Sequence, residues 1–298
     1  MQSGIIVINK PKDLTSQAVV SRVKHLFGEK KAGHTGTLDP MATGVLPVLL
    51  GRAVKASDYM LTSDKYYRAT LTLGLKTDTE DATGTVLYTH AGDIPDEDEV
   101  RRVIGAFVGK IKQTPPMYSA IKMGGKKLCD LARAGVTVER EAREITVHSI
   151  EVTRIDEKNY SLDVHCQKGT YIRTLCHDIG EALGVGGIMS ALLRTRASIF
   201  TLEDAYTLDE LEAMTPDERA GAILPTERVF EDYAKVTLPD FFARLASSGC
   251  PIYLRKIGIR LDLGTKVRLY RAGEFFAIGE CRELDGEPVI KPTKQFLI

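Results

Sequence analysis

One short segment of this 298-residue chain combines an acidic side chain with a loop that could hold it in place. Residues 33–44 read GHTGTLDPMATG, so three glycines and a proline surround Asp39. This density of glycine excludes a helix and indicates a tight loop, and Pro40 favours an extended backbone at Asp39. A single carboxylate held on such a loop could stabilise positive charge or attack an electrophile, although most loop aspartates only hydrogen-bond their own turn.

Two further segments carry residue types that suit a binding pocket. Tyr67 lies in residues 65–74, KYYRATLTLG, whose alternating pattern predicts a strand. The sequence QKGTYIRTLC predicts a loop that enters a helix with Thr170 as its N-cap, and it carries Tyr171 and Arg173. An arginine in the first turn of a helix opposes the helix dipole, which hints at a carboxylate partner. Taken alone, Tyr67 would more often be a core residue, and the arginine could equally be an ordinary surface residue.

Residues 33–48, GHTGTLDPMATGVLPV, closely resemble the signature loop of the TruB family of tRNA pseudouridine synthases, G-H-x-G-x-L-D-P-x-A-x-G-x-L. The strand around Tyr67 and the segments 113–122 (QTPPMYSAIK) and 168–175 (KGTYIRTL) resemble three further motifs of that family. A match of this length and order is specific. The resemblance implies an enzyme that isomerises uridine to pseudouridine at position 55, in the T-loop of tRNA.

The resemblance assigns roles to three residues of these motifs. In the family the loop aspartate, here Asp39, is the essential catalytic residue, the arginine, here Arg173, pairs with it, and the tyrosine, here Tyr67, stacks on the target base. A base that has left its RNA helix needs such an aromatic face. Asp39 could attack the sugar, attack the base or remove the C2′ proton, and the sequence leaves these three possibilities open.

Three further positions follow from the same resemblance. Tyr171 is implied to line the pocket, and His34 to fill the gap that the extruded nucleotide leaves in the RNA. Leu193, in the sequence LLRTR, is implied to pack near the base. Without the resemblance, His34 would be read as an ordinary loop histidine and Leu193 as an ordinary core residue.

Two other functions compete with this interpretation. A non-catalytic tRNA-binding or tRNA-folding protein could keep the same scaffold, but every motif residue is present. A nucleoside hydrolase or glycosidase would want a second carboxylate or a metal ion, and no partnered second acid stands out in the motifs. Isomerisation involves no net oxidation or hydrolysis, so we expect neither a cofactor nor a metal.

The segments around the motifs predict the elements that position them. Residues 4–10, GIIVINK, predict a strand, and a helix is expected to follow from Ser16 as its N-cap. The apolar run after the signature loop predicts a buried strand, which Pro47 would place at a sheet edge or a bulge. The fold that the resemblance implies is α+β, with a mixed, largely antiparallel sheet flanked by helices, the pseudouridine synthase fold.

The chain is expected to contain two domains. Residues 1–234 are predicted to form the catalytic domain, with a basic insertion at about 110–143 that could clamp the RNA through its phosphates. Residues 235–298 combine short strands with tight turns and loosely resemble the small, β-barrel-like PUA domain that binds RNA. The acidic stretch 201–234 is predicted to connect the two on the side away from RNA.

Charge is balanced in total but segregated along the chain. The sequence has 40 basic and 40 acidic residues. Residues 101–150 hold ten Lys and Arg against four Asp and Glu, whereas residues 201–234 hold two against ten. Such segregation permits a basic face on a neutral protein. The expected partner for that face is the T-arm of tRNA.

Cysteine and hydropathy patterns limit the remaining possibilities. The five scattered cysteines form no Cys-x-x-Cys pair, and the six histidines do not cluster at metal-binding spacing. No apolar run reaches membrane-spanning length, and the first residues, MQSG, do not match a signal peptide. We therefore expect a reduced, metal-free protein of the cytoplasm that acts as a monomer without a membrane partner.

Overall fold

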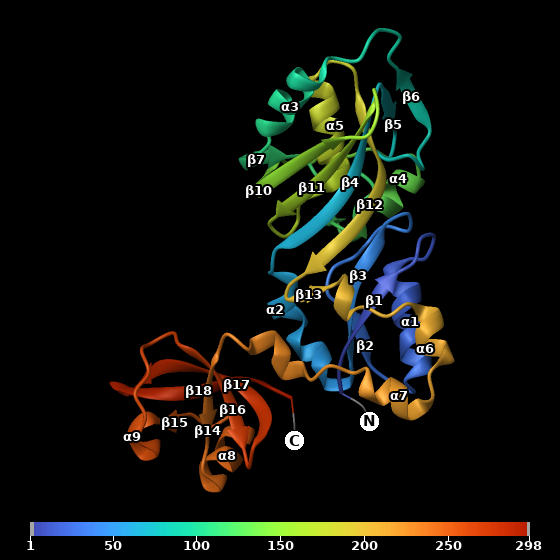
Figure 1. Ribbon diagram of the computed structural model, residues 1–298. Helices are drawn as coiled ribbons and strands as arrows, with labels where there is room; N and C mark the ends of the chain where they lie inside the picture. The colour runs from blue at the N-terminus through green and yellow to red at the C-terminus, as the bar shows by residue number, and fades with distance from the viewer. Residues whose placement is uncertain (1–2, 297–298) are drawn as a thin grey trace.

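Two large sheets form the framework of the molecule (Figure 1). The computed structural model describes residues 3–296. The strands of the larger sheet are β1 (Gly4–Lys10), β2 (Ala32–His34), β3 (Thr43–Leu50), β4 (Lys65–Leu73), β7 (Gly109–Gln113), β10 (Arg143–Arg154), β11 (Asn159–Cys166), β12 (Gly187–Ala197) and β13 (Phe200–Thr201).

The larger sheet has the strand order β1-β3-β12-β4-β11-β10-β7, with β2 paired to β3 and β13 paired to β12. Its pairings are antiparallel except that of β12 with β3. The expected mixed, largely antiparallel sheet is therefore confirmed.

The first two long strands contain unbroken apolar runs, residues 5–8 of β1 and 45–50 of β3, because both of their faces are covered there. In β1, Ile6 and Ile8 belong to the main core of the molecule, whereas Ile5 and Val7 pack into a second apolar cluster on the opposite face. Successive side chains of a strand point to opposite faces. A run without polar residues is thus what this position in the sheet requires.

The prediction that Pro47 lies at a sheet edge is wrong. β3 is paired with β1 along its whole length, and on its other side with β12 near Thr43 and with β2 from Val48 onward. The carbonyl of Pro47 accepts a hydrogen bond from the backbone N–H of Thr35, so its nitrogen faces the gap between those two partners. The missing N–H therefore leaves no ladder bond of β1 unmade.

Helices cover the larger sheet in two groups. α1 packs on β2 and β3, and α6 packs on α1 and β1, whereas α3 and α5 lie together over β10, β4 and β12 (Figure 1). The helical segments of this part of the chain are α1 (Ser16–Leu26), η1 (Gly51–Ala56), α2 (Ser57–Leu61), α3 (Glu97–Gly105), α5 (Ile172–Ala182), η2 (Leu202–Asp204), α6 (Leu208–Ala213), α7 (Pro216–Gly221) and η3 (Thr226–Phe230).

Both predicted N-caps are wrong by one residue. Thr15, not Ser16, caps α1 through a bond from the backbone N–H of the third helical residue. The buried Ser16 hydroxyl instead accepts from the N–H of Leu38 and donates to its carbonyl, at 2.8 and 2.9 Å. α5 has Tyr171 at its N-cap position, and the Thr170 hydroxyl donates to a carbonyl of its own loop. In each case the start of the helix was predicted correctly to within one residue, and a neighbour of the predicted residue lies at the N-cap position.

The smaller sheet lies in the C-terminal part of the chain and has its own apolar core. Its strand order is β14-β16-β17-β18-β15. Its elements are β14 (Ala234–Thr237), α8 (Asp240–Ser247), β15 (Ile252–Tyr253), α9 (Leu254–Ile257), β16 (Lys266–Arg271), β17 (Glu274–Leu284) and β18 (Glu287–Gln295). The hairpin expected around Ala272 and Gly273 is β16–β17. The PUA identity of this part stays a prediction.

An apolar cluster joins the smaller sheet to the rest of the molecule. Phe230 of η3 packs with Ala56 of η1 and with Ile278 and Phe296 of the smaller sheet. At the edge of this contact, the half-buried Lys294 pairs with the exposed Asp58 at 2.8 Å. The two sheets are therefore held together by burial of apolar surface, to which an exposed ion pair adds little.

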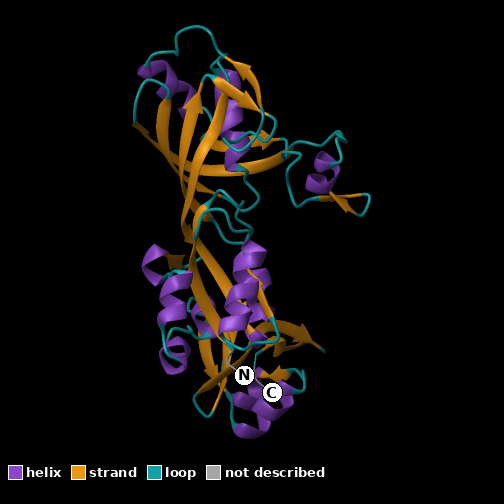
Figure 2. Ribbon diagram, turned by 90° about the vertical axis from the view of Figure 1, so that its right-hand side faces the viewer, coloured by secondary structure: helices purple, strands orange, loops and turns teal. Residues whose placement is uncertain are grey.

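Two small hairpins extend from the larger sheet. One is formed by β5 (Leu75–Thr77) and β6 (Val86–Thr89). The other comprises β8 (Lys122–Met123) and β9 (Lys126–Lys127) and runs into α4 (Leu128–Arg133). We call residues 114–142 the arm; its hairpin and helix project from the side of the molecule (Figure 2). Within residues 3–296, no helix has both the length and the apolar character needed to cross a membrane.

α5 can approach the sheet only because of a glycine contact. A Cβ built on Gly180 would overlap the backbone of Gly186 and Gly187, where β12 begins. The carbonyl of Gly180 also accepts the backbone N–H of Gly186 at 2.9 Å. Backbone atoms cannot move aside as a flexible side chain can, so this contact fixes the position of α5.

We predict that Gly180→Ala lowers the free energy of unfolding by roughly 1–3 kcal/mol or more, because the added methyl overpacks backbone against backbone. The direction is informative, since alanine in a helix is otherwise favoured over glycine by about 1 kcal/mol. Chemical denaturation of the two variants gives the comparison. Gly105→Ala in α3 is the matched control, because a Cβ there meets open space, and it should be neutral or slightly stabilising. Equal stability of the two variants would contradict the packing argument.

Candidate active site

A cavity of about 680 Å³ opens beside Asp39. Its wall is assembled from parts of the chain that are far apart in sequence. They are the turn 79–83, the arm, residues 167–173, and residues 36–41 of the segment 33–44, which we call the signature loop. Side chains of β4 and β12 complete the wall. Four of the residues singled out from the sequence line it, namely Asp39, Tyr67, Tyr171 and Arg173.

The loop that carries Asp39 is held by hydrogen bonds to its backbone on both sides of that residue. The ammonium group of Lys10 donates to the carbonyl of Pro40 at 3.1 Å, and the N–H of Asp13 donates to the same carbonyl at 2.8 Å. On the other side of Asp39, the hydroxyl of Ser16 hydrogen-bonds both the N–H and the carbonyl of Leu38. The carboxylate is thus presented by a backbone that its surroundings hold in place.

The Asp39 carboxylate forms an ion pair with Arg173. Oδ2 of Asp39 lies 3.0 Å from Nε of Arg173, whose side chain is 5% exposed while that of Asp39 is 38% exposed. The guanidinium also donates from Nη1 to the carbonyl of Thr79, at 3.0 Å, and from Nη2 to the carbonyl of Tyr118, at 2.7 Å. The expectation that an arginine at the start of a helix has a carboxylate partner agrees with this geometry.

A second carboxylate, Asp81, supports the arginine from behind. Its Oδ2 lies 3.6 Å from Nη1 of Arg173, and its side chain is 5% exposed. Its Oδ1 accepts three bonds, from the hydroxyl of Thr79 and from the N–H and hydroxyl of Thr83. The sequence analysis missed this residue. The signal that could have found it is an aspartate placed two residues from a threonine on either side.

The electrostatics of Asp39 are a balance of opposed effects. Burial in the cavity wall raises the pKa of the Asp39 carboxyl, the Arg173 guanidinium lowers it, and the nearby Asp81 carboxylate raises it again. The net direction is upward. Arg173 is thus the group that opposes protonation most strongly, because a buried carboxylate without a cation favours its neutral form.

Two tyrosines line the cavity from different elements. Tyr67 projects from β4, and burial raises the pKa of its hydroxyl although the Arg194 guanidinium opposes this. Tyr171 precedes α5, and burial raises the pKa of its hydroxyl as well. The side-chain amide of Gln113 fixes this residue by accepting from its N–H at 2.8 Å and donating to its carbonyl at 3.0 Å. Both hydroxyls stay neutral near pH 7.

Leu193 is placed differently from the expectation. It lines a second cavity, of about 580 Å³, together with Lys10 and Thr43, whereas its neighbours Leu192 and Arg194 line the cavity at Asp39. The physical reason is the alternation of a strand, which sends neighbouring side chains of β12 to opposite faces. Leu192 is thus the leucine in the wall of the cavity at Asp39, and the role of Leu193 near the base stays a prediction.

His34 lies behind the signature loop. It belongs to β2, opposite Val48 of β3, and is half-buried. Burial lowers the pKa of its imidazole, and the positive charge of Arg194 acts in the same direction. Its Nδ1 is buried without a hydrogen-bond partner among residues 3–296. The structure thus brings four of the six expected residues together at one cavity and places His34 and Leu193 outside its lining.

Three buried cations around the site were not found from the sequence. Arg194, 1% exposed, donates to the carbonyls of Val45 and Gly36 at 2.7 and 3.1 Å. Burial lowers the pKa of Lys10 to about 8, against the opposing charges of Asp13 and Asp39. Burial likewise lowers the pKa of Lys65 to about 8. Lys10 also lowers the pKa of Asp39, and all three cations favour a negative charge in whatever binds beside that residue.

The arrangement suits chemistry that needs one ionised carboxylate beside flat apolar surfaces. Of the two carboxylates paired with Arg173, Asp39 is the accessible one, because its side chain is 38% exposed whereas Asp81 is 5% exposed and is engaged by Thr79, Thr83 and Arg173. A pair of carboxylates acting as acid and nucleophile, which glycosidases use, is thus not what this part of the chain provides.

Comparison with known proteins identifies two family models. Residues 24–172 match "TruB family pseudouridylate synthase (N terminal domain)", and residues 173–231 match "tRNA pseudouridylate synthase B C-terminal domain". Proteins named tRNA pseudouridine synthase B are close in sequence. The one from Aromatoleum aromaticum is 41% identical over 98% of this chain and 92% of its own length. The one from Alkaliphilus oremlandii is 44% identical over 95% and 94%.

Solved structures agree with this grouping. The chain is similar to one in the crystal structure of a Cbf5-Nop10-Gar1 complex, with a TM-score of 0.71 and 30% identity, over 99% of this chain and 85% of that one. It is also similar to one in the structure of an H/ACA RNP bound to a substrate RNA containing 2′-deoxyuridine. There the TM-score is 0.73 and the identity 28%, over 100% and 86%.

We predict that Arg173→Met raises the pKa of Asp39 further, because the cation that stabilises the ionised form is removed while burial and Asp81 remain. A carboxyl-carbon NMR titration of Asp39 measures this directly. Arg68→Met is the control, since Arg68 pairs with Asp163 at an exposed position, and it should leave the pKa of Asp39 unchanged. A pKa that stays the same in Arg173→Met would show that the ion pair has no influence on the carboxylate.

Proposed function

The chain belongs to the TruB family and is a tRNA pseudouridine synthase, and we propose that it isomerises the uridine at position 55 in the T-loop of tRNA. Its fold is that of the pseudouridine synthases. The observation that carries the proposal is the Asp39 carboxylate, which faces a cavity on a fixed loop and is paired with a buried arginine. The position in tRNA, the extrusion of the base and the role of Asp39 are all part of the proposal.

Asp39 is proposed as the catalytic residue because of what the isomerisation requires. The N1–C1′ bond breaks, the uracil turns, C5 bonds to C1′, and the C5 proton leaves. Cleavage at C1′ develops positive charge on the sugar, which a carboxylate can stabilise or trap covalently. Attack on the sugar, attack on the base and removal of the C2′ proton each need the ionised form, and the Arg173 guanidinium supports that form.

The target uridine is proposed to enter the cavity after leaving the RNA stack. The cavity volume of about 680 Å³ falls within the range of roughly 300–1,000 Å³ typical of small-ligand sites. Tyr67 offers an aromatic face, while Tyr171 and Leu192 add apolar surface. Extrusion costs a few kcal/mol that such stacking can offset. His34, just outside the lining, stays the candidate for filling the gap left in the RNA.

The alternative of a non-catalytic tRNA-binding protein is less well supported. Burying an arginine against two carboxylates puts stability at risk, because loss of one partner leaves an uncompensated buried charge that costs several kcal/mol. A protein that only binds RNA gains nothing in return for this risk. The hydrogen bonds that fix the backbone on both sides of Asp39 likewise serve the position of one carboxylate rather than a large contact surface. We favour catalysis for this reason.

RNA is proposed to bind across the arm and the C-terminal part of the chain. The protein is proposed to act as a monomer in the cytoplasm. The arm carries exposed lysines on β8 and β9, and its residues Cys129 and Arg133 also line the cavity. Phosphate contacts from such a segment position an RNA without reading its sequence. The T-arm is then held by the surface while the base is recognised inside the cavity.

We predict that Asp39→Asn abolishes pseudouridine formation in tRNA while tRNA affinity stays within a few-fold of wild type, because the carboxylate serves the chemistry. Mapping of modified uridines in treated tRNA gives both the activity and its position. Asp13→Asn is the matched control. It removes another carboxylate at the rim of the cavity, but one that is exposed and has a left-handed backbone that asparagine accepts. Turnover above a tenth of the wild-type rate in Asp39→Asn would remove Asp39 from the chemical step, and a product elsewhere than position 55 would refute the proposed substrate.

We predict that replacing Lys126 and Lys127 by alanine weakens tRNA binding and lowers the slope of log affinity against log salt by about one for each phosphate that a lysine no longer neutralises. Both side chains are exposed and lie outside the cavity lining, so the effect should fall on KM rather than kcat. Binding titrations at several salt concentrations provide the slopes. Lys158→Ala, in the exposed turn between β10 and β11, is the control. An unchanged slope in the double variant would place the RNA elsewhere.

A further inference from the structure

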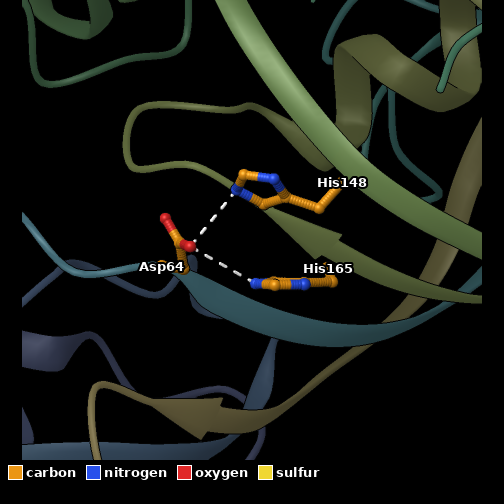
Figure 3. Close-up of side chains that lie close together, drawn as sticks. All are labelled: Asp64, His148 and His165. Carbon is orange, nitrogen blue, oxygen red and sulfur yellow. Dashed lines mark ion pairs between the residues drawn. The ribbon is translucent and has the colours of Figure 1, made fainter. Parts of the chain in front are cut away.

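Two histidines and an aspartate meet on the larger sheet, where β4, β11 and β10 lie side by side (Figure 3). Oδ2 of Asp64 lies 3.2 Å from Nε2 of His148 and 3.4 Å from Nε2 of His165. All three ligand-type atoms lie within 4.8 Å of one another. Figure 3 shows the carboxylate between the two rings, with one nitrogen of each ring turned toward it.

We propose that Asp64, His148 and His165 form a binding site for a divalent transition-metal ion of the zinc type. Zinc binds imidazole nitrogen and carboxylate oxygen at about 2.0–2.2 Å, usually in tetrahedral geometry. Two ligand atoms of such a tetrahedron lie roughly 3.3–3.5 Å apart, which follows from those bond lengths. The two contacts of Asp64 therefore have nearly the spacing that a bound ion would impose, and only small side-chain movements are needed to admit one.

The backbone is shaped to bring these side chains together. β10 and β11 pair with Val147 opposite Cys166 and Ser149 opposite His165, so His148 is the extra residue of a β-bulge. A bulge changes the direction of a side chain and is frequent beside functional sites. Without it, strand alternation would give His148 another orientation relative to His165. Asp64 reaches the same place from the residue before β4.

The orientation of His165 is fixed by stacking. Its ring lies parallel to that of Tyr66, with a centroid separation of 4.0 Å and an interplanar angle of 8°. The guanidinium of Arg196 lies over the Tyr66 ring, 5.3 Å from its centroid. Contacts that hold a histidine ring in place favour metal binding because less freedom is lost when the ion binds.

The site is open to an ion from solution. The side chain of His148 is 38% exposed, that of Asp64 42% and that of His165 25%. Three protein ligands leave a fourth position for water. Because the three come from the segment before β4, from β10 and from β11, a bound ion would tie these segments together. Lys65, which follows Asp64, lines the cavity at Asp39, so the ion would also stiffen one edge of that cavity.

Sequence spacing gave no hint of this site. The expectation of a metal-free protein rested on the absence of histidines at metal-binding spacing, and His148 and His165 are separated by sixteen other residues. Only antiparallel pairing of the two strands brings them together. The proposal does not depend on the proposed function, because metal binding is measured without RNA.

The test is calorimetric titration of the full chain with Zn²⁺, with Co²⁺ absorption spectra as a second measurement. We expect one high-affinity equivalent for the wild type. We expect a loss of affinity of at least tenfold, roughly the least that an altered metal surrounding costs, in His148→Gln and in Asp64→Asn. The asparagine variant matters because it can still hydrogen-bond both imidazoles but is a poor ligand. His90→Gln, at a histidine outside the cluster, is the matched control and should bind as the wild type does.

Two further readouts separate this site from adventitious binding. Co²⁺ bound at the proposed site should give the intense visible bands of low coordination number without sulfur-to-cobalt charge transfer. A charge-transfer band would instead indicate binding at a cysteine, of which Cys129 and Cys250 are the ones not buried. Zinc at a hundredfold excess over its Kd should raise the melting temperature by roughly 5 °C in the wild type and in His90→Gln only. Equal zinc affinity in all four proteins, a thiolate spectrum, or no binding by the wild type would each overturn the proposal.

Discussion

The structure depends on one buried guanidinium. Arg173 is removed from water at the start of α5, where the helix dipole also opposes it, and a buried cation without partners would cost several kcal/mol. Its partners are the carboxylates of Asp39 and Asp81 and the carbonyls of Thr79 and Tyr118. These belong to the signature loop, the turn 79–83 and the arm. One desolvated charge thus decides how three distant segments meet.

The larger sheet provides the fixed surface that this network needs. α5 reaches β12 through the backbone contact of Gly180, and Gln113 at the end of β7 holds Tyr171 just before Arg173. On the other side, Lys10 and Arg194 hold the carbonyls of the signature loop. Each of these groups is buried and is satisfied mainly by backbone atoms. The carboxylate is therefore oriented by the larger sheet and the elements packed on it, and not by its loop alone.

The proposed functions divide between the cavity and the arm. The groups proposed for chemistry lie in a cavity lined by residues before 200, and the exposed lysines of β8 and β9, proposed to hold the RNA, lie on the arm outside that lining. The smaller sheet is attached through the aromatic cluster at Phe230, so it has a structural as well as a proposed binding contribution. A neutral total charge is compatible with this division because the acidic stretch 201–234 offsets the basic surface.

The sequence by itself determined the loop at Asp39, the strand after it, the strands at 4–10 and 65–74, the helices that begin near residues 16 and 171, the family, and four of the residues that line the cavity. Those predictions rest on local patterns, since glycine, proline and alternation act over a few residues. The tertiary structure alone decided the rest. It turned Leu193 away and Leu192 inward, placed Pro47 inside the sheet, assigned the cap of α1 to Thr15, and recruited Asp81, Arg194 and Lys10 to the site. Each of these outcomes depends on which strand, loop or charge lies opposite in space, and that information is absent from the spacing of residues along the chain.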